Sequence, residues 1–161
     1  MRIMRAGMLA LVAAMLCGTA AEAGETSNPN GRFSIWLPDP WTVTQKRSGI
    51  VAENPKHNIY MVASPVVLVD ADSLDEAVRT FVDNELDDAK ITKDDETKHQ
   101  GFAARRLQGT GRDEGDDVIF QCIVIDPGNN RDPLAVLIYG DPKPMEEAPP
   151  LEKILGSLKP L

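Results

Sequence analysis

Cysteine and histidine are scarce in this chain, with two of each among 161 residues. Cys17 falls in an N-terminal segment with the features of a removable leader. Cys122 is then the one cysteine left, and a single cysteine cannot form an internal disulfide. His57 and His99 have neither paired spacing nor a second cysteine beside them, which argues against a zinc site. We expect no metal or cofactor, two exposed histidines, and a Cys122 thiol that is buried and inert.

Long apolar runs are also missing. The apolar run near the N-terminus, residues 6–16, is too short for a membrane-spanning helix, which needs roughly 20 residues. It follows Arg2 and Arg5 and precedes small residues that end in Ala-Glu-Ala at 21–23, the pattern of a secretory signal peptide. We expect residues 1–23 to be cleaved off, no transmembrane segment in the mature chain, and a periplasmic location, with secretion as the alternative.

Basic residues are outnumbered: 17 Lys and Arg stand against 25 Asp and Glu, for a formal net charge of −8. Loss of the leader, which holds two arginines and one glutamate, leaves 15 basic and 24 acidic residues and a net charge near −9. A surface of this sign repels phosphate backbones, so nucleic acid and anionic lipid are not expected as partners. It favours cations or a basic protein face, although the same charge also serves solubility.

The N-terminal third predicts short strands joined by tight turns. Residues 24–31 are small and polar and are expected to form a flexible lead-in. Residues 32–37 alternate apolar and polar side chains, and residues 41–46 resume the pattern after a Pro-Asp-Pro turn, which predicts a hairpin. Residues 49–53 and 58–64 predict a second strand pair.

A helix is the clearest element predicted from the sequence. Ser73 and Glu76 fit a capping box, in which each side chain satisfies a backbone N–H at the start of the helix. Apolar residues then recur at helical spacing and form one stripe. They are Leu74, Ala77, Val78, Phe81, Val82, Leu86 and Ala89. This stripe predicts a helix laid on an apolar sheet face.

The C-terminal half predicts the centre of the sheet. Residues 118–125 and 134–139, joined by a Pro-Gly-Asn-Asn turn, have lost polar alternation, as expected for strands covered on both faces. Before them lie residues 91–99 and 102–110, with a turn between these two segments. Residues 151–158 carry the apolar stripe of a short closing helix. Short turns link most of the sheet, so we expect an antiparallel sheet with helices on its faces, an α+β arrangement.

Both ends of this region carry recognisable motifs. Residues 33–41 contain Phe-Ser-Ile-x-Leu-Pro-x-x-Trp, and residues 154–160 contain Ile-Leu-x-Ser-Leu-Lys-Pro. With a helix opening at 72–76 and Gly-Phe-x-Ala at 101–104 between them, the chain resembles the PsbP/Mog1-like superfamily. The resemblance implies a single domain over residues 32–161, an α/β/α sandwich around a twisted, mainly antiparallel sheet with helices on its faces, and binding to other proteins. Where the family usually has glycine before the tryptophan this chain has proline, which implies a different turn.

Motifs for catalysis or ligand binding are few. Gly-Thr-Gly at 109–111 lacks the lysine and the following helix of a phosphate loop, and no Gly-x-Ser-x-Gly element supports a serine hydrolase. The loop at 112–117 is strongly acidic but lacks the residue order of an EF-hand calcium loop. A solvated acidic hairpin loop is the simpler interpretation, because charge runs in loops are normally solvated.

These observations favour a binding protein over an enzyme. We expect an exported, monomeric, periplasmic accessory or binding protein that contacts another periplasmic or membrane protein and catalyses nothing. The candidate contact residues are acidic residues of the loop and two tryptophans that we also expect to pack at the core edge. They are Trp36, Trp41, Asp113, Glu114, Asp116 and Asp117. The alternatives are a carrier of a small apolar ligand and a small hydrolase built from scattered carboxylates and one histidine.

Overall fold

The computed structural model describes residues 24–67, 73–147 and 151–161, so the predicted signal peptide at 1–23 lies outside the described residues. In these ranges the chain forms ten strands and three helices. They are β1 (Gly24–Asn28), β2 (Phe33–Leu37), β3 (Thr42–Gln45), β4 (Ile50–Asn54), β5 (Ile59–Pro65), α1 (Leu74–Glu85), β6 (Asp87–His99), β7 (Phe102–Asp113), β8 (Asp116–Asp126), β9 (Leu134–Gly140), α2 (Pro142–Glu147), α3 (Leu151–Gly156) and β10 (Lys159–Pro160). None of these helices is long and apolar enough to cross a bilayer.

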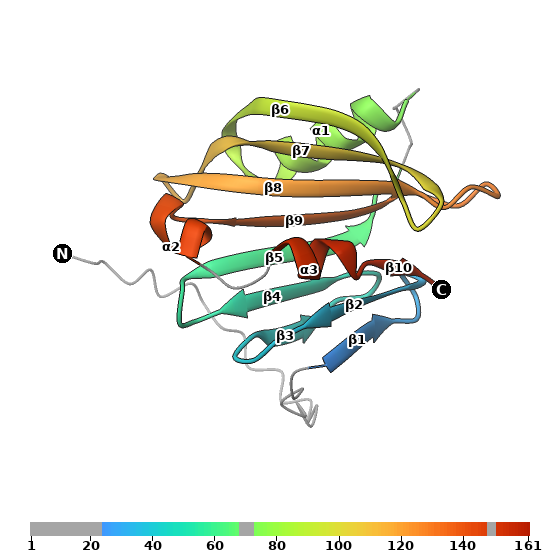
Figure 1. The fold of residues 1–161 in the computed structure, drawn as a ribbon, viewed down its shortest axis with the longest axis horizontal. Coiled ribbons are helices and arrows are strands. Elements are labelled where there is room, and N and C mark those ends of the chain that lie inside the picture. Colours follow the sequence, from blue (N-terminus) through green and yellow to red (C-terminus); the bar gives the residue numbers. More distant parts are fainter. Residues whose placement is uncertain (1–23, 68–72, 148–150) are drawn as a thin grey trace.

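An antiparallel sheet of seven strands forms the centre of the fold, in the order β3-β4-β5-β9-β8-β7-β6 (Figure 1). The β4–β5 and β8–β9 pairs agree with the strand pairs predicted from the sequence. β8 and β9 lie inside the sheet, and their apolar runs are buried from both sides. Burial on both faces explains why these two segments lack polar alternation.

The large sheet is covered on both faces, so the predicted α+β sandwich with a mainly antiparallel sheet is confirmed. α1 packs on one face, which we call the α1 face. α2, α3 and a small sheet of order β1-β2-β10 cover the other face, which we call the small-sheet face (Figure 1). Phe33, Ile35 and Leu37 of β2 point into the core of the small-sheet face, as their alternation predicts.

α1 follows the predicted capping pattern. The Ser73 hydroxyl accepts a hydrogen bond from the backbone N–H of Glu76, at 3.2 Å. The helix ends at Glu85, earlier than the predicted stripe, because Leu86 has an extended backbone and the chain turns directly into β6. Leu86 is nevertheless buried in the same core as the helix.

The N-terminal segment differs from the prediction in two ways. Residues 24–28 form β1 instead of a flexible lead-in, and the buried Asn28 side chain donates to the carbonyls of Lys46 and Gly49 at 3.0 and 2.9 Å. The predicted hairpin between residues 32–37 and 41–46 is wrong, since β2 pairs with β1 and β10 whereas β3 pairs with β4. The Pro-Asp-Pro segment carries the chain from one layer to the other.

Two further elements differ from the prediction: β6 begins before the predicted segment 91–99, with which its pairing to β7 otherwise agrees, and α2 has no predicted counterpart. β6 spans 13 residues at the sheet edge, where one side of the backbone has no neighbouring strand and most side chains are exposed. Its polar sequence therefore gives no strand alternation, although polar and charged edges are typical of natural sheets. α2 is a single short helix that buries mainly Met145, which is too little to produce a helical stripe in the sequence.

Candidate interaction site

The turn between β7 and β8 carries the acidic residues singled out in the sequence. Glu114 and Gly115 form the two-residue turn, with positive φ angles of 51° and 94°. Such a backbone suits a tight hairpin turn with glycine at its second position. Asp113 lies opposite Asp116 across the turn. The acidic segment is therefore the tip of a long hairpin.

Strand alternation separates the four acidic side chains. Asp116 is in phase with the β8 residues that are buried under α1, so it faces that side of the sheet, as does its partner Asp113. Asp117 faces the opposite side, where the Arg112 guanidinium lies 3.8 Å from its carboxylate. The structure thus brings Asp113, Glu114 and Asp116 together and sets Asp117 apart.

These three carboxylates line a surface pocket of about 280 Å³, which we call the acidic pocket. The β4–β5 turn and the end of β9 supply the rest of the lining, and Figure 1 shows these segments at the same end of the sheet as the β7–β8 turn. The lining residues are Asn58, Tyr60, Asp113, Glu114, Asp116, Val118, Gly140 and Asp141. Four of them are acidic and none is basic, so the pocket suits a positively charged group.

Two tyrosines, the only ones in the chain, lie side by side at this pocket. Tyr60 of β5 is the register partner of Tyr139 of β9, and their rings stack with 5.7 Å between centroids. The Tyr60 hydroxyl donates to Asn58 Oδ1 at 3.0 Å. Phe120 continues the aromatic row on β8, and the row ends at Gly109, where a Cβ would lie only 2.7 Å from the Phe120 ring. We call Tyr60 and Tyr139 the tyrosine pair.

Burial and the surrounding carboxylates raise the pKa values of both tyrosines and of Asp113. Burial raises the pKa of Tyr139 to about 12, and Asp113 adds to the rise. Burial also raises the pKa of Tyr60, with Glu53 and Asp113 as the next causes. The pKa of Asp113 is itself raised, first by burial and then by the acidic residues beside it. Both tyrosines and Asp113 therefore lie in partly desolvated surroundings that also contain carboxylates.

The tryptophans lie elsewhere and serve the core. Trp41 is 5% exposed and packs in the core of the small-sheet face. Trp36 is half-buried against the same core; its backbone N–H donates to Ser157 Oγ at 2.9 Å, and Lys153 Nζ lies 4.1 Å from its ring centre. Neither tryptophan lines the acidic pocket, so the structure does not join the two groups of predicted contact residues into one surface.

Two of the residues considered for catalysis, His99 and Cys122, are buried in the fold. His99 is buried, and its Nε2 lies 2.7 Å from the Leu158 carbonyl oxygen. The expectation of an exposed His99 was wrong, because the β6–β7 turn closes over the end of α3. Cys122 is buried under α1 as predicted, and burial raises the pKa of its thiol. Among the described residues, no three His, Cys, Asp or Glu side chains are placed to hold one metal ion.

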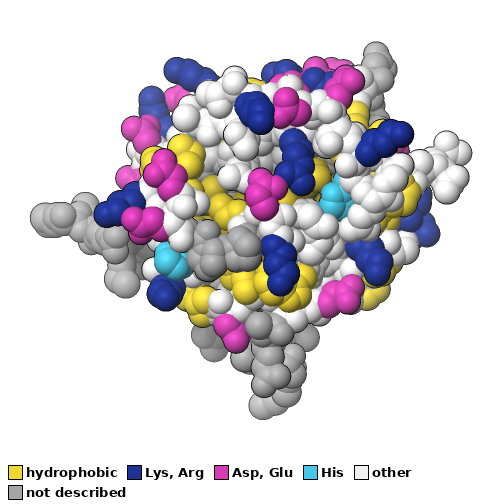
Figure 2. Space-filling view, viewed as in Figure 1, with side chains coloured by type: hydrophobic (Ala, Val, Ile, Leu, Met, Phe, Trp, Pro, Cys, Tyr) yellow, Lys and Arg dark blue, Asp and Glu magenta, His cyan; other side chains and the backbone are white. Residues whose placement is uncertain are grey.

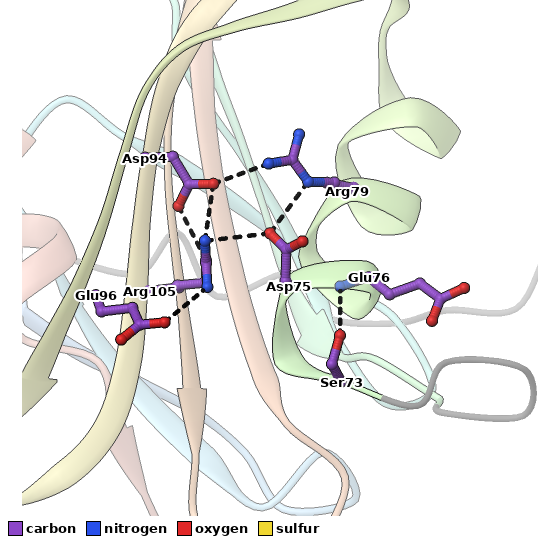
Figure 3. A network of polar contacts seen from close by, with 7 residues as sticks. All are labelled: Ser73, Asp75, Glu76, Arg79, Asp94, Glu96 and Arg105. Atoms are coloured by element: carbon purple, nitrogen blue, oxygen red, sulfur yellow. Dashed lines mark hydrogen bonds and ion pairs between the residues drawn. The ribbon is translucent and has the colours of Figure 1, made fainter.

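A second group of charges fastens α1 to β6 and β7 (Figure 3). Arg105 donates to both oxygens of Asp94 at 2.9 Å, and its guanidinium also lies 3.3 Å from Asp75 and 3.2 Å from Glu96. Arg79 bridges Asp75 and Asp94 at 3.0 and 2.9 Å. The hydrogen bond with Asp94 is the first cause of a raised pKa for Arg105. These charges satisfy one another, so this arginine network holds the helix in place and offers little to a ligand.

Charged side chains also line three other pockets within the described ranges. One of them, of about 750 Å³, lies beside Pro142 of α2 and carries both signs of charge, including Lys90, Arg112 and Asp117. Two smaller pockets likewise contain acidic and basic residues. Figure 2 shows the same mixture of basic and acidic groups over the small-sheet face. A carrier of an apolar ligand would need an apolar cavity, which none of these four pockets provides.

Sequence comparisons found no matching family and no matching curated protein. The structure is similar to cyanobacterial PsbP (CyanoP) from Synechocystis, with a TM-score of 0.60 over 91% of this chain and 98% of that one, at 12% identity. It is also similar to the Ran-binding protein Mog1p of Saccharomyces cerevisiae, with a TM-score of 0.59 over 83% and 93% of the two chains, at 12% identity. The chain has a PsbP/Mog1-like fold. The resemblance seen in the terminal motifs is therefore confirmed at the level of the fold.

A third protein with this PsbP/Mog1-like fold comes from a bacterial envelope context. LpqN of Mycobacterium tuberculosis, which is involved in cell envelope biogenesis, matches with a TM-score of 0.54 over 80% of this chain and 83% of its own, at 15% identity. At such identities the matches describe the fold and leave the site to be argued from this chain's own residues.

Five of the eight residues that line the acidic pocket were not predicted from the sequence. Asn58, Tyr60 and Asp141 come from segments that are distant in sequence from the acidic hairpin tip. One signal was available: the only two tyrosines both fall in predicted strands. Pairing those strands with each other would have placed the rings side by side, but the sequence did not reveal that β5 and β9 are neighbours.

Proposed function

We propose that this protein is an exported, periplasmic accessory protein that binds another protein of the cell envelope and catalyses no reaction. The leader pattern of residues 1–23 supports export. Two proteins with the same fold support a binding or envelope role: Mog1p is a Ran-binding protein, and LpqN is involved in cell envelope biogenesis.

The acidic pocket is the observation that carries the proposal. It gathers four carboxylates and a tyrosine at the end of the sheet, with Glu114 and Asp116 exposed at the hairpin tip. A concentrated charge of one sign accelerates encounter with a partner of the opposite sign. Of the residues considered for catalysis, Cys122 and His99 are buried away from it, and His57 lies half-buried in the β4–β5 turn without lining the pocket, which favours binding over chemistry.

Site-specific photo-crosslinking in the native host tests the binding role. Benzoyl-phenylalanine at Glu114 probes the hairpin tip, and the same group at Lys98 is the control, because Lys98 is also exposed but lies near the β6–β7 turn at the opposite end of the sheet. We expect one defined envelope protein to be captured from position 114 and not from position 98. Equal capture from both positions, or none from either, would contradict the proposal.

Export and the lack of catalysis have their own tests. Intact-mass analysis of the protein from its host should show a chain that begins at Gly24, and retention of Met1 would contradict export. Turnover of a small substrate by the purified protein, with activity lost in His57→Ala or His99→Ala, would favour the enzyme instead.

A further inference from the structure

α1 covers only part of its face of the large sheet. Its main contacts lie on β6, β7, β8 and β9, and Val62 of β5 borders the core beneath it. On β4 and β5, side chains of the same face remain partly exposed, among them Val51, Glu53, Tyr60 and Val62. The tyrosine pair stands at the boundary between the covered and uncovered parts, next to the acidic pocket. The α1 face thus presents an aromatic and aliphatic strip that ends in a negatively charged pocket.

We propose that this strip receives a basic segment of the partner protein, with an arginine side chain laid against Tyr60 and its guanidinium directed into the acidic pocket. The inference rests on the proposed function and names the chemistry of its partner.

Charge complementarity selects a basic occupant. The pocket has four acidic lining residues and no basic one, and Glu53 and Glu85 also act on the tyrosine pair. The nearest cation on the hairpin, Arg112, faces the other side of the sheet and pairs there with Asp88 and Asp117. An acidic or neutral segment would leave these carboxylates without a counter-charge, whereas a basic segment supplies it.

The spacing of the carboxylates favours an extended organic cation over a metal ion. In the described residues no three acidic side chains converge on a point, as calcium coordination requires. The carboxylates come from the hairpin tip and from the end of β9, so they surround the pocket. A planar guanidinium with five N–H donors can contact several such oxygens at once.

The tyrosine pair favours arginine over lysine. An aromatic face attracts a cation, and arginine also stacks its plane on the ring while its donors stay free for carboxylates. The Tyr60 hydroxyl is held by Asn58 and both rings are held against each other, so the surface is ordered before a partner arrives. Little side-chain freedom is then lost on binding.

The experiment uses three blocked hexapeptides with alternating glycine and one charged residue: arginine, lysine or glutamate. Each is titrated into the mature protein at low ionic strength, and affinity and contact positions are followed by amide chemical shifts. We expect the arginine peptide to bind with shifts confined to residues 51–62, 113–116 and 139–141, the lysine peptide to bind several-fold more weakly, and the glutamate peptide not to bind.

Two variants and one matched control localise the effect. Tyr60→Leu keeps an apolar strand residue and should weaken arginine-peptide binding about fivefold. The triple change Asp113→Asn, Glu114→Gln, Asp116→Asn should weaken it by about tenfold or more. The control triple, Asp95→Asn, Asp132→Asn, Glu146→Gln, removes the same charge at exposed positions outside the pocket and should change affinity less than about twofold.

Each other outcome overturns the inference. Equal losses of peptide affinity in the two triple variants would mean general charge attraction. Equal affinity for the arginine and lysine peptides would contradict the stacking of arginine on Tyr60. Tight binding of calcium chloride at the hairpin tip would mean that the pocket binds a metal ion and not a guanidinium. Failure of the proposed function is distinct: a partner captured at position 114 whose binding ignores Tyr60→Leu overturns only the inference. Peptide binding without any captured partner overturns only the proposed function.

Discussion

The two faces of the large sheet are closed in different ways. Within the described ranges, the core of the small-sheet face contains 20 buried residues, and the core of the α1 face contains 13. The first is closed by a second sheet and two helices drawn from both ends of the chain, the second mainly by one helix from its middle. The larger core should therefore contribute more to stability, because hydrophobic stabilisation follows the apolar area removed from water.

Because the two faces are covered to different extents, we expect the small-sheet face to serve mainly stability and the α1 face to serve binding. The small-sheet face is covered by three strands and two helices, whereas the α1 face keeps part of β4 and β5 partly exposed. The acidic pocket and the tyrosine pair belong to this less covered side. Changes in the small-sheet core should thus alter folding, and changes beside the tyrosine pair should alter binding with little effect on folding.

The largest expected effect is in the core of the small-sheet face. Phe33 is 1% exposed, and its truncation to alanine removes a ring from a tightly packed region. We expect Phe33→Ala to lower the free energy of unfolding by about 4 kcal/mol, from lost burial and the cavity left behind. Urea denaturation followed by circular dichroism measures this loss.

Phe81→Ala applies the same change to the core under α1. Phe81 is 7% exposed and belongs to the smaller core, so we expect a loss of about 3 kcal/mol in the same urea assay. An unchanged midpoint would mean that α1 does not bury this side chain. A loss larger than that of Phe33→Ala would reverse the order of the two faces.

Disrupting the arginine network should lower the free energy of unfolding by less than either core truncation. The Arg105 side chain is 20% exposed and makes paired bonds to Asp94, so Arg105→Met should lower stability by about 1–2 kcal/mol. Arg112→Met is the matched control, because the Arg112 side chain is 54% exposed and its pairs are single contacts. We expect the control to cost less than about 0.5 kcal/mol. Similar losses would show that the network does not hold α1 more firmly than an ordinary surface pair.

The smallest expected effect is on pH dependence at the acidic pocket. Burial and neighbouring carboxylates raise the pKa of Asp113 in the folded protein. The folded state then binds a proton more readily than the unfolded state, so this group lowers stability as pH rises from about 4 through its folded pKa. Asp113→Asn should remove that decline.

Melting temperatures at several pH values check this sign. Relative to wild type, Asp113→Asn should gain more at pH 7 than at pH 4, by roughly a degree. Asp132→Asn, an exposed change outside the pocket, serves as the control. A gain that is largest at pH 4 would contradict the assigned direction of the pKa.

The sequence predicts those helices and strands whose own residues carry a recognisable pattern. The cap and stripe of α1 and the two apolar runs of β8 and β9 carry their own periodicity, and they match the structure. β1 does not, because its small polar residues show no apolar alternation although it pairs with β2 directly after it. β10 does not either, because it is only two residues long and its position depends on pairing with β2, at the other end of the chain. A strand specified by a distant neighbour leaves no local pattern to read.

The same limit applies to the candidate site. The acidic hairpin tip is visible in the sequence because its charges are consecutive, but the tyrosine pair depends on the β5–β9 register. Trp36 and Trp41 are large and close in sequence, yet both pack against the core of the small-sheet face and neither lines the acidic pocket. Site residues drawn from several strands require the strand order, and composition does not supply it.

The position of β2 between β1 and β10 has a consequence for how the protein is made. Synthesis proceeds from the N-terminus, so Phe33 and Ile35 leave the ribosome long before α3 and β10, which help to cover them. The small-sheet face therefore stays open until the final residues have been added. A chain that stops before residue 151 keeps α1 but exposes a wide apolar surface, and it becomes a substrate for chaperones and proteases.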